Sequence, residues 1–142
     1  MSSVTYYSGP RGDMINVTEG TTHGSFKAGD LVIYDADGRI VIATSGLVAG
    51  IATKDATGTA GTAHLIEEIT PDTKYVATYK ASAITQALVG DLLDFTYTAG
   101  AHTLDETGAT TDVYCVALKD AATTVSGQLI VKFMYTNFSC TK

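Results

Sequence analysis

The chain has 142 residues, a length typical of one domain with a hydrophobic core of ordinary size. Hydrophobic residues make up 45% of the chain and charged residues 17%, a balance that excludes disorder over the whole length. The formal net charge of −6 argues against a nucleic-acid partner, because no basic surface can dominate such a chain.

The residue types favour an all-β fold. Threonine, alanine and glycine are abundant, proline is rare, and β-branched residues outnumber good helix formers over most of the chain. No secretory signal is recognised, and the apolar runs are too short to span a bilayer, so no membrane partner is expected.

Residues 1–25 are predicted to form an extended N-terminal arm. The stretch is polar and rich in turn residues, and one strand is expected within it at residues 14–18. A segment with so little apolar area cannot fold alone, so it is either disordered or rests on another surface.

Residues 26–142 are predicted to form a single β domain, whose first half is residues 26–80. The turn Asp35-Ala36-Asp37-Gly38 has an apolar run on each side, and an Asp-Gly pair in that position is a strong hairpin signal. The strands expected in this half are residues 31–34, 39–43, 47–53, 64–69 and 74–80.

The second half of the domain is residues 81–142. Residues 83–89 are expected to form a short helix or an irregular crossover. The strands expected in this half are residues 92–97, 112–118 and 128–135.

Three runs of the first half return in the same order in the second. Gly29 matches Gly90 at an offset of 61 residues, Lys54 matches Lys119 at 65, and Gly61 matches Gly127 at 66. Two half-sheets of this kind can bury together a face that neither buries alone. The sequence therefore predicts a small barrel or sandwich built from two similar β-rich halves, with about eight to ten short strands.

No catalytic set and no cofactor site is recognised. The histidines His23, His64 and His102 lie too far apart for a metal-ligand motif, and Asp35 to Gly38 is a better hairpin turn than calcium loop, because no glutamate follows at the required spacing. Two cysteines make no disulfide framework; Cys115 is expected to be a small buried hydrophobe, and Cys140 lies near the end of the chain. The chain is therefore expected not to be an enzyme.

Three short motifs are set aside. They are the integrin-type tripeptide Arg11-Gly12-Asp13 and the glycosylation acceptors Asn16-Val17-Thr18 and Asn137-Phe138-Ser139. Each acts only outside the cell or in the secretory pathway, and the sequence offers no targeting segment that would lead there.

The repeated frame carries a resemblance to a known family. Gly-Asp-Leu opens a strand, a Gly-Ile-Ala strand follows a loop, and a Gly-x-x-apolar run ends the unit. This frame resembles that of the tailed-phage capsid decoration (head cement) proteins over roughly residues 26–135. The runs that carry it are residues 28–34, 47–56 and 61–66, then 89–95, 113–121 and 127–133. The second half departs from the pattern where Tyr114-Cys115 stands in place of the small pair Ala49-Gly50.

The resemblance implies a structural protein of the virion. Such proteins are assembled in the host cytoplasm, bind the outside of an expanded icosahedral head, commonly as trimers, and bridge subunits of the major capsid protein. This role needs no cofactor, nucleic acid or membrane. An arm that orders on binding could add a strand to an exposed edge of the capsid protein, and three arms on a trimer would strengthen a weak single contact.

The resemblance directs attention to the arm as the capsid-binding element. We expect its larger side chains to make the contact: Val4, Tyr6, Tyr7, Arg11, Met14 and Ile15. Tyrosine pairs offer rigid apolar area with a polar tip, as interface anchors do. The alternative is that these residues cover the protein's own barrel. A subunit interface is assigned to the face of Leu129, Val131 and Phe133, with core burial as its alternative.

Two other classes remain open from the sequence. One is a β-structural component of a phage tail or fibre, which would share this composition. The other is a small barrel that binds a ligand or glycan, or an unrecognised hydrolase. A binding barrel should have an aromatic-lined pocket, and a hydrolase should bring His64 or His102 to a nucleophile or carboxylate.

Overall fold

The computed structural model describes residues 4–20, 26–44, 47–98, 100–106 and 113–134, and over these residues it is an all-β protein. One short 3-10 helix, η1 (Gln86–Leu88), lies in the stretch expected to be a helix or crossover. The eleven strands are β1 (Val4–Ser8), β2 (Met14–Thr18), β3 (Leu31–Tyr34), β4 (Ile40–Ile42), β5 (Gly50–Ala52), β6 (Ala63–Glu68), β7 (Lys74–Thr78), β8 (Leu92–Thr98), β9 (Ala101–Asp105), β10 (Val113–Leu118) and β11 (Gln128–Phe133).

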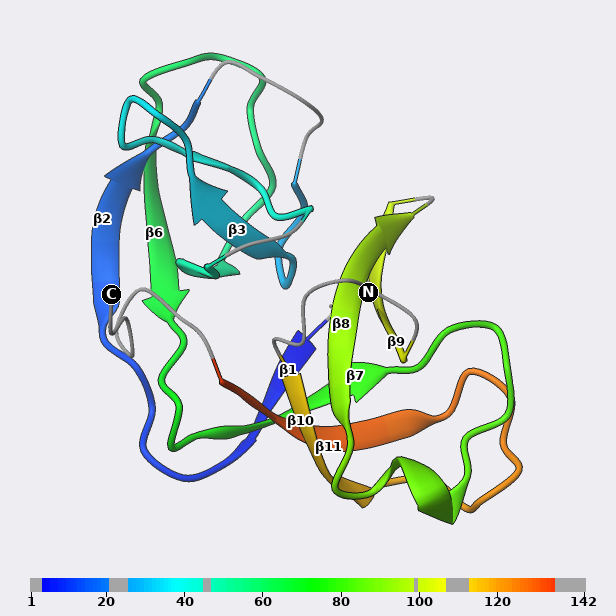
Figure 1. Cartoon of the computed structure of the whole chain (residues 1–142). Helices are drawn as coiled ribbons and strands as arrows, with labels where there is room; N and C mark the ends of the chain where they lie inside the picture. The colour runs from blue at the N-terminus through cyan, green and yellow to red at the C-terminus, as the bar shows by residue number, and fades with distance from the viewer. Residues whose placement is uncertain (1–3, 21–25, 45–46, 99, 107–112, 135–142) are drawn as a thin grey trace.

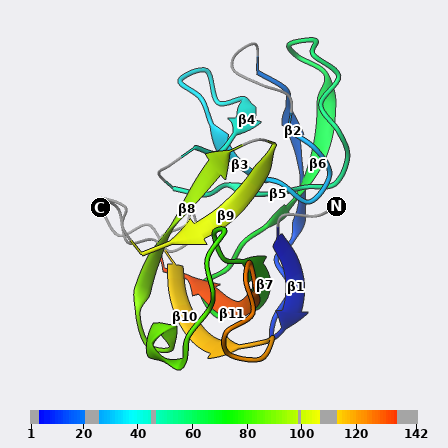
Figure 2. The same ribbon diagram turned by 90° about the vertical axis from the view of Figure 1, so that its right-hand side faces the viewer.

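The strands form two sheets that lie side by side (Figures 1 and 2). The five-stranded sheet has the order β2-β6-β5-β3-β4, and the six-stranded sheet has the order β1-β7-β11-β10-β8-β9. All pairings between named strands are antiparallel. The predicted all-β architecture, with two similar halves, is confirmed.

The two sheets share one strand order once β1 is set aside. Strands β2 to β6 correspond in turn to β7 to β11, and each set is joined in the same sequence across its sheet. The hydrogen bonds agree residue by residue at the predicted glycine turn. Gly29 N–H donates to the carbonyl of Ala52 and Gly90 N–H to that of Cys115, both at 2.8 Å. Ala52 N–H and Cys115 N–H in turn donate to Asp30 and Asp91.

The repeat boundaries differ from those expected from the sequence. The units are residues 14–68 and 74–133, so β2 belongs to the first unit rather than to an arm, and β7 opens the second unit rather than closing the first. The offset of 61 at Gly29 is right, but Ala52 corresponds to Cys115 at an offset of 63. From the registers, Glu67 corresponds to Lys132 at 65.

Each unit closes on itself through one parallel bridge. Glu19, just after β2, bridges to Ile40 of β4, and Tyr79, just after β7, bridges to Leu104 of β9. The next amide along donates in both units, from Gly20 to the Ile40 carbonyl and from Lys80 to the Leu104 carbonyl, each at 2.9 Å. First and last strands of each unit therefore meet, as in a small barrel.

The expected separate N-terminal arm is not present as such. β1 pairs with β7 in the six-stranded sheet, and β2, the strand expected at residues 14–18, pairs with β6 in the five-stranded sheet. Alternation gives each strand one face for the interior: Val4 is buried in the core, and Ile15 and Val17 pack against a second hydrophobic cluster. A few apolar residues are sufficient because they add to sheets that already exist.

The main hydrophobic cluster joins the two units. It contains Leu31 and Ile51 from the first unit and Tyr75, Leu93 and Phe133 from the second. The buried residues of a smaller cluster, which includes Phe26, all come from the first unit, and Tyr97 of β8 packs against it from the second. Because the main cluster draws on both sheets, neither unit buries its own apolar face without the other.

The Asp35 to Gly38 segment is the predicted hairpin turn. Asp35 Oδ1 accepts hydrogen bonds from the amides of Asp37 and Arg39, both at 2.9 Å, and Gly38 has φ of +74°. The carboxylate closes the turn instead of facing outward as a cation ligand.

Gly90 offers a test of the repeated turn. Its φ is +92°, close to the +91° of Gly29, and open space surrounds the position of an added Cβ. Gly90→Ala is therefore expected to destabilise the protein by about 1 kcal/mol through backbone strain alone. Urea denaturation measures the change. Gly90→Asn should reduce stability less than Gly90→Ala, since asparagine tolerates positive φ better than alanine. Equal stability of the wild type and both variants would contradict a positive φ at Gly90.

Candidate functional site

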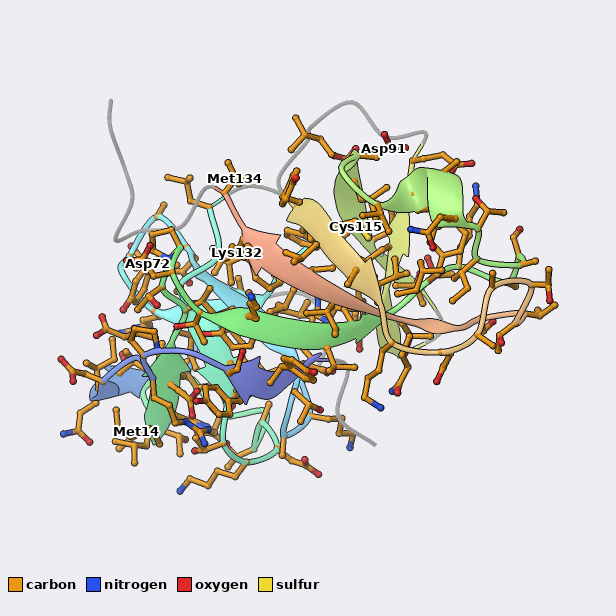
Figure 3. The ribbon with its side chains drawn as sticks, turned by 90° about the horizontal axis from the view of Figure 1, so that it is seen from below. Met14, Asp72, Asp91, Cys115, Lys132 and Met134 are labelled. Atoms are coloured by element: carbon orange, nitrogen blue, oxygen red, sulfur yellow. The ribbon has the colours of Figure 1, made fainter. Side chains whose placement is uncertain are left out.

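The residues expected to bind a partner fall into three groups in the structure. Val4 is 4% exposed and belongs to the core, and Ile15 is partly buried against the smaller cluster. Tyr7 and Met14 are exposed at 47% and 48%, and Figure 3 shows Met14 at the periphery of the fold. Tyr6 and Arg11 are held by neighbours within the chain. The alternative that these residues cover the protein's own barrel thus describes Val4 and Ile15, and leaves Tyr7 and Met14 on the surface.

Arg11 and Tyr6 form a small polar cluster with Glu67 of β6. Arg11 donates to Glu67 Oε1 at 2.7 Å, and its guanidinium lies 4.2 Å from the centre of the Tyr6 ring. The hydrogen bond to Glu67 raises the pKa of Arg11. Tyr6 donates from its hydroxyl to the carbonyl of Gly9 at 2.7 Å. This cluster ties the loop between β1 and β2 to the five-stranded sheet.

A surface hollow of about 280 Å³ lies beside this cluster, between β1 and β5. Val4, Tyr6 and Arg11 form one side, and Ile51 and Ala52 form the other. The hollow lies between the two sheets. Tyr6 lines it, and exposed Tyr7 is the next residue along β1. The hollow is a place where a partner side chain could enter beside the first strand.

The face assigned to a subunit interface is core instead. Leu129, Val131 and Phe133 are each 0% exposed and belong to the main hydrophobic cluster. They do share one face of β11, as the period of two predicted, but that face is directed at the other strands of the same chain. No surface remains on these side chains for a second subunit.

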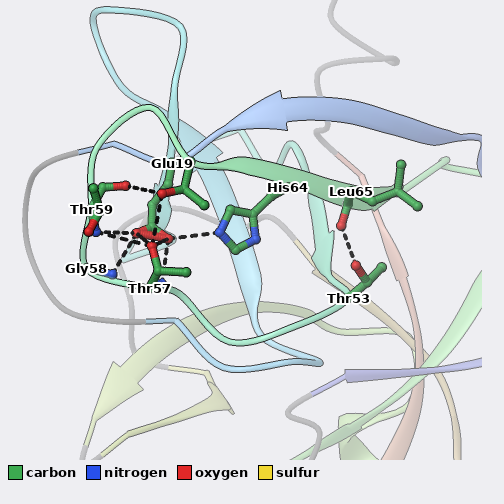
Figure 4. Close-up of polar contacts among 8 residues, drawn as sticks. Glu19, Thr53, Thr57, Gly58, Thr59, His64 and Leu65 are labelled. Atoms are coloured by element: carbon green, nitrogen blue, oxygen red, sulfur yellow. Dashed lines mark hydrogen bonds and ion pairs between the residues drawn. The ribbon is translucent and has the colours of Figure 1, made fainter.

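Glu19 occupies a buried site that the sequence did not reveal (Figure 4). Its carboxylate accepts hydrogen bonds from the amides of Thr57, Gly58 and Thr59 at 2.7–3.0 Å. His64 Nε2 lies 2.8 Å from Glu19 Oε1. Burial by itself would raise the pKa of Glu19, but the hydrogen bonds from Thr57 and His64 outweigh it and lower the pKa.

The Glu19–His64 pair is structural rather than a catalytic dyad. The two side chains are 2% and 1% exposed, so no substrate can reach them. The carboxylate holds the loop at residues 57–59 against the end of β2 and uses its oxygens for that purpose. Glu19 stands in the polar lead of the sequence, and no local pattern links it to a loop almost forty residues away.

His102 makes a buried contact between the two units. Its Nε2 lies 2.7 Å from the carbonyl of Ala43, and its Nδ1 lies 3.8 Å from Asp30 Oδ1. The ring packs against Tyr97, with the ring centres 4.8 Å apart. His102 belongs to the second unit, and Ala43 and Asp30 to the first. The histidine therefore joins the units in the interior and has no access to solvent, since it is 3% exposed.

The other candidate reactive groups are the two cysteines and His23. Cys115 is fully buried and unpaired, and burial raises the pKa of its thiol to about 11, so it behaves as the small hydrophobe that was expected. His23 and Cys140 lie outside the described residues. Within the described part of the chain, no three histidine, cysteine, aspartate or glutamate side chains gather as metal ligands, and no helix is long and apolar enough to cross a membrane.

Comparisons of the chain with protein-family models, curated proteins and solved structures found no match.

The buried carboxylate gives a pH-dependent prediction. Glu19→Gln should destabilise the protein by about 2–4 kcal/mol at neutral pH, because an amide cannot accept all the hydrogen bonds that the carboxylate accepts. The pKa of Glu19 is lowered in the folded state, so its stabilisation is present above the unfolded pKa of about 4.3 and is lost as the pH falls through the folded value.

Urea denaturation of wild type and variant between pH 3 and pH 7 measures this difference, which should shrink at the acid end. Asp37→Asn is the matched control: Asp37 is an exposed carboxylate, and its removal should change stability little. A Glu19→Gln penalty that does not vary with pH would contradict the assignment of an ionised carboxylate.

Proposed function

We propose that this chain is a decoration or cement protein, a structural virion protein that binds the outside of a tailed-phage capsid as a trimer and stabilises it. The observation that carries the proposal is the duplicated Gly-Asp-Leu frame. In both units this frame opens the equivalent strand, β3 and β8, after a glycine with positive φ. The frame is the part of the sequence that resembles the decoration proteins.

The distribution of polar groups supports a binding role over a catalytic one. The two buried histidine–carboxylate pairs are both used to hold loops and units together, and each is closed to solvent. The surface of β1 and β2 instead presents the exposed side chains of Tyr7 and Met14, and the loop between these strands presents exposed Arg11. Large apolar side chains of this kind anchor protein interfaces.

The net charge agrees with a position outside the shell. A chain with a formal charge of −6 is repelled by packaged DNA, while a protein partner needs only a local match of charge. The proposed partner is the major capsid protein, bridged at neighbouring subunits. Two β units joined through one hydrophobic cluster are suited to that bridging role.

The proposal predicts saturable binding to heads. The purified chain is mixed with expanded heads that lack their decoration protein, from the phage whose genome encodes this chain, and is then separated by size exclusion with light scattering. Co-elution at a fixed number of copies per head is expected, with a mass of three chains for the free protein if the trimer forms first. Heads that already carry the protein are the control. Absence of binding to bare heads would refute the proposal.

The exposed tyrosine of β1 is expected to contribute to that binding. Tyr7→Ala should weaken binding to bare heads by about 2 kcal/mol, the range of an interface anchor, without loss of stability, because the side chain is exposed in the free chain. Tyr114→Ala is the matched control, an exposed tyrosine on β10 of the six-stranded sheet. Equal binding by the two variants would remove Tyr7 from the contact.

A further inference from the structure

The duplication leaves one strand without a counterpart. In the second unit, β1 lies along the outer side of β7, and its Thr5 faces Val76. In the first unit, β2 is the equivalent of β7, and among the described residues no strand pairs with its outer side. Figure 1 shows β2 at the margin of the fold, with β6 on its inner side.

The hydrogen-bond pattern of β2 identifies which backbone groups face outward. Glu68 N–H donates to the carbonyl of Asp13, and Glu19 N–H donates to that of Thr62, so the odd-numbered residues of this stretch are directed at β6. The even-numbered residues Met14, Asn16 and Thr18 are directed away from it. Gly20, the next in this series, donates outward to Ile40.

The same pattern holds in the second unit, where the outward side is occupied. Tyr79 N–H donates inward to Gly127, and Lys80 N–H donates outward to Leu104. Val76, an even-numbered residue of β7, therefore faces outward, and this is the residue that β1 meets. By the register of the repeat, Asn16 is the equivalent of Val76. An unpaired edge of this kind is a template for another strand.

The surroundings of β2 favour a strand with apolar residues at alternate positions. In the second unit, Val4 of β1 lies opposite Ala77 and is buried. The equivalent of Ala77 is Val17, and beside Val17 lies a surface hollow of about 430 Å³ that Tyr34 and Gly38 of the β3–β4 hairpin also line. An apolar side chain opposite Val17 would enter this hollow as Val4 enters the core.

Carboxylates lie at both ends of the outer edge of β2, and they favour a partner strand with basic ends. Exposed Asp13 precedes β2, and Asp35 lies beside Gly20 at the other end, where its Oδ2 would be 2.6 Å from an added Cβ. A second copy that paired antiparallel through β2 would bring Asp13 of one copy toward Asp35 of the other, in a chain already at −6. A segment with lysine or arginine at its ends complements both.

We propose that the outer edge of β2, at Met14, Asn16 and Thr18, accepts an extended segment of the capsid protein as an added antiparallel strand, with alternating apolar residues and basic ends. This inference rests on the proposed function and names the contact it would use. In this arrangement the partner strand would pair with β2 of the first unit, just as β1 pairs with β7 of the second.

Hydrogen exchange at single amides tests the proposal on the full chain, free and bound to bare expanded heads. In the free chain, the amides of Met14, Asn16 and Thr18 should exchange quickly and those of Ile15 and Val17 slowly. On heads, the three outward amides should become protected. Saturable binding without that protection would overturn the strand-addition contact and leave the proposed function standing. Absence of binding would overturn both.

Two further results bear on the occupant. Protection of the same amides in the free chain that increases with protein concentration would assign the edge to a second copy and overturn the proposal. Asn16→Pro removes the outward N–H and leaves the ladder to β6 intact, as edge strands tolerate. It should lower affinity for heads at least about tenfold, while Asn16→Ala, which keeps the N–H, should bind like the wild type. Equal binding by both variants would contradict the proposal.

Discussion

The pairing of backbone groups at strand edges is the constraint on which this fold depends. A short five-stranded sheet exposes two edges, and each unit curls until its first and last strands meet at one point, Glu19 and Ile40 in the first and Tyr79 and Leu104 in the second. The closure is brief, one bridge in each unit, so the outer sides of β2 and β7 are not covered by it. β1 covers the second of these strands, and the first is open among the described residues.

Closure also decides where the polar side chains go. Curling brings loops close to strand ends, and those loops carry amides that need acceptors. Glu19 meets that need at residues 57–59. Between the units, His102 Nε2 donates a hydrogen bond to the carbonyl of Ala43. The buried Glu19, His64 and His102, which are of the types that often act in catalysis, therefore make contacts that hold the fold together. What the surface offers a partner is apolar side chains and an unpaired strand edge, and both suit the proposed capsid contact better than a reaction.

Prediction from the sequence succeeded where a signal is local. The hairpin at Asp35 to Gly38 and the paired turns at Gly29 and Gly90 depend on residues a few positions apart. It was wrong about where the first strands belong: the strand at residues 14–18 was expected, but as part of an arm, whereas β2 pairs with β6 in the five-stranded sheet. The register irregularity between Cys115 and Ala117 of β10 has no counterpart in the pair of β5 and β6, and it was not expected either. The buried contact of Glu19 could not be foreseen, since its partners lie almost forty residues away.

The sequence by itself determined that this protein is all-β and that its core unit occurs twice, because composition, period and turn chemistry act over short distances. Only the tertiary structure decided where each unit begins, that Leu129, Val131 and Phe133 face the interior, and that β1 and β2 belong to different sheets. Those outcomes depend on which strand edges meet after the chain has curled. Edge pairing uses backbone groups that every residue except proline has, and so leaves little mark in the sequence.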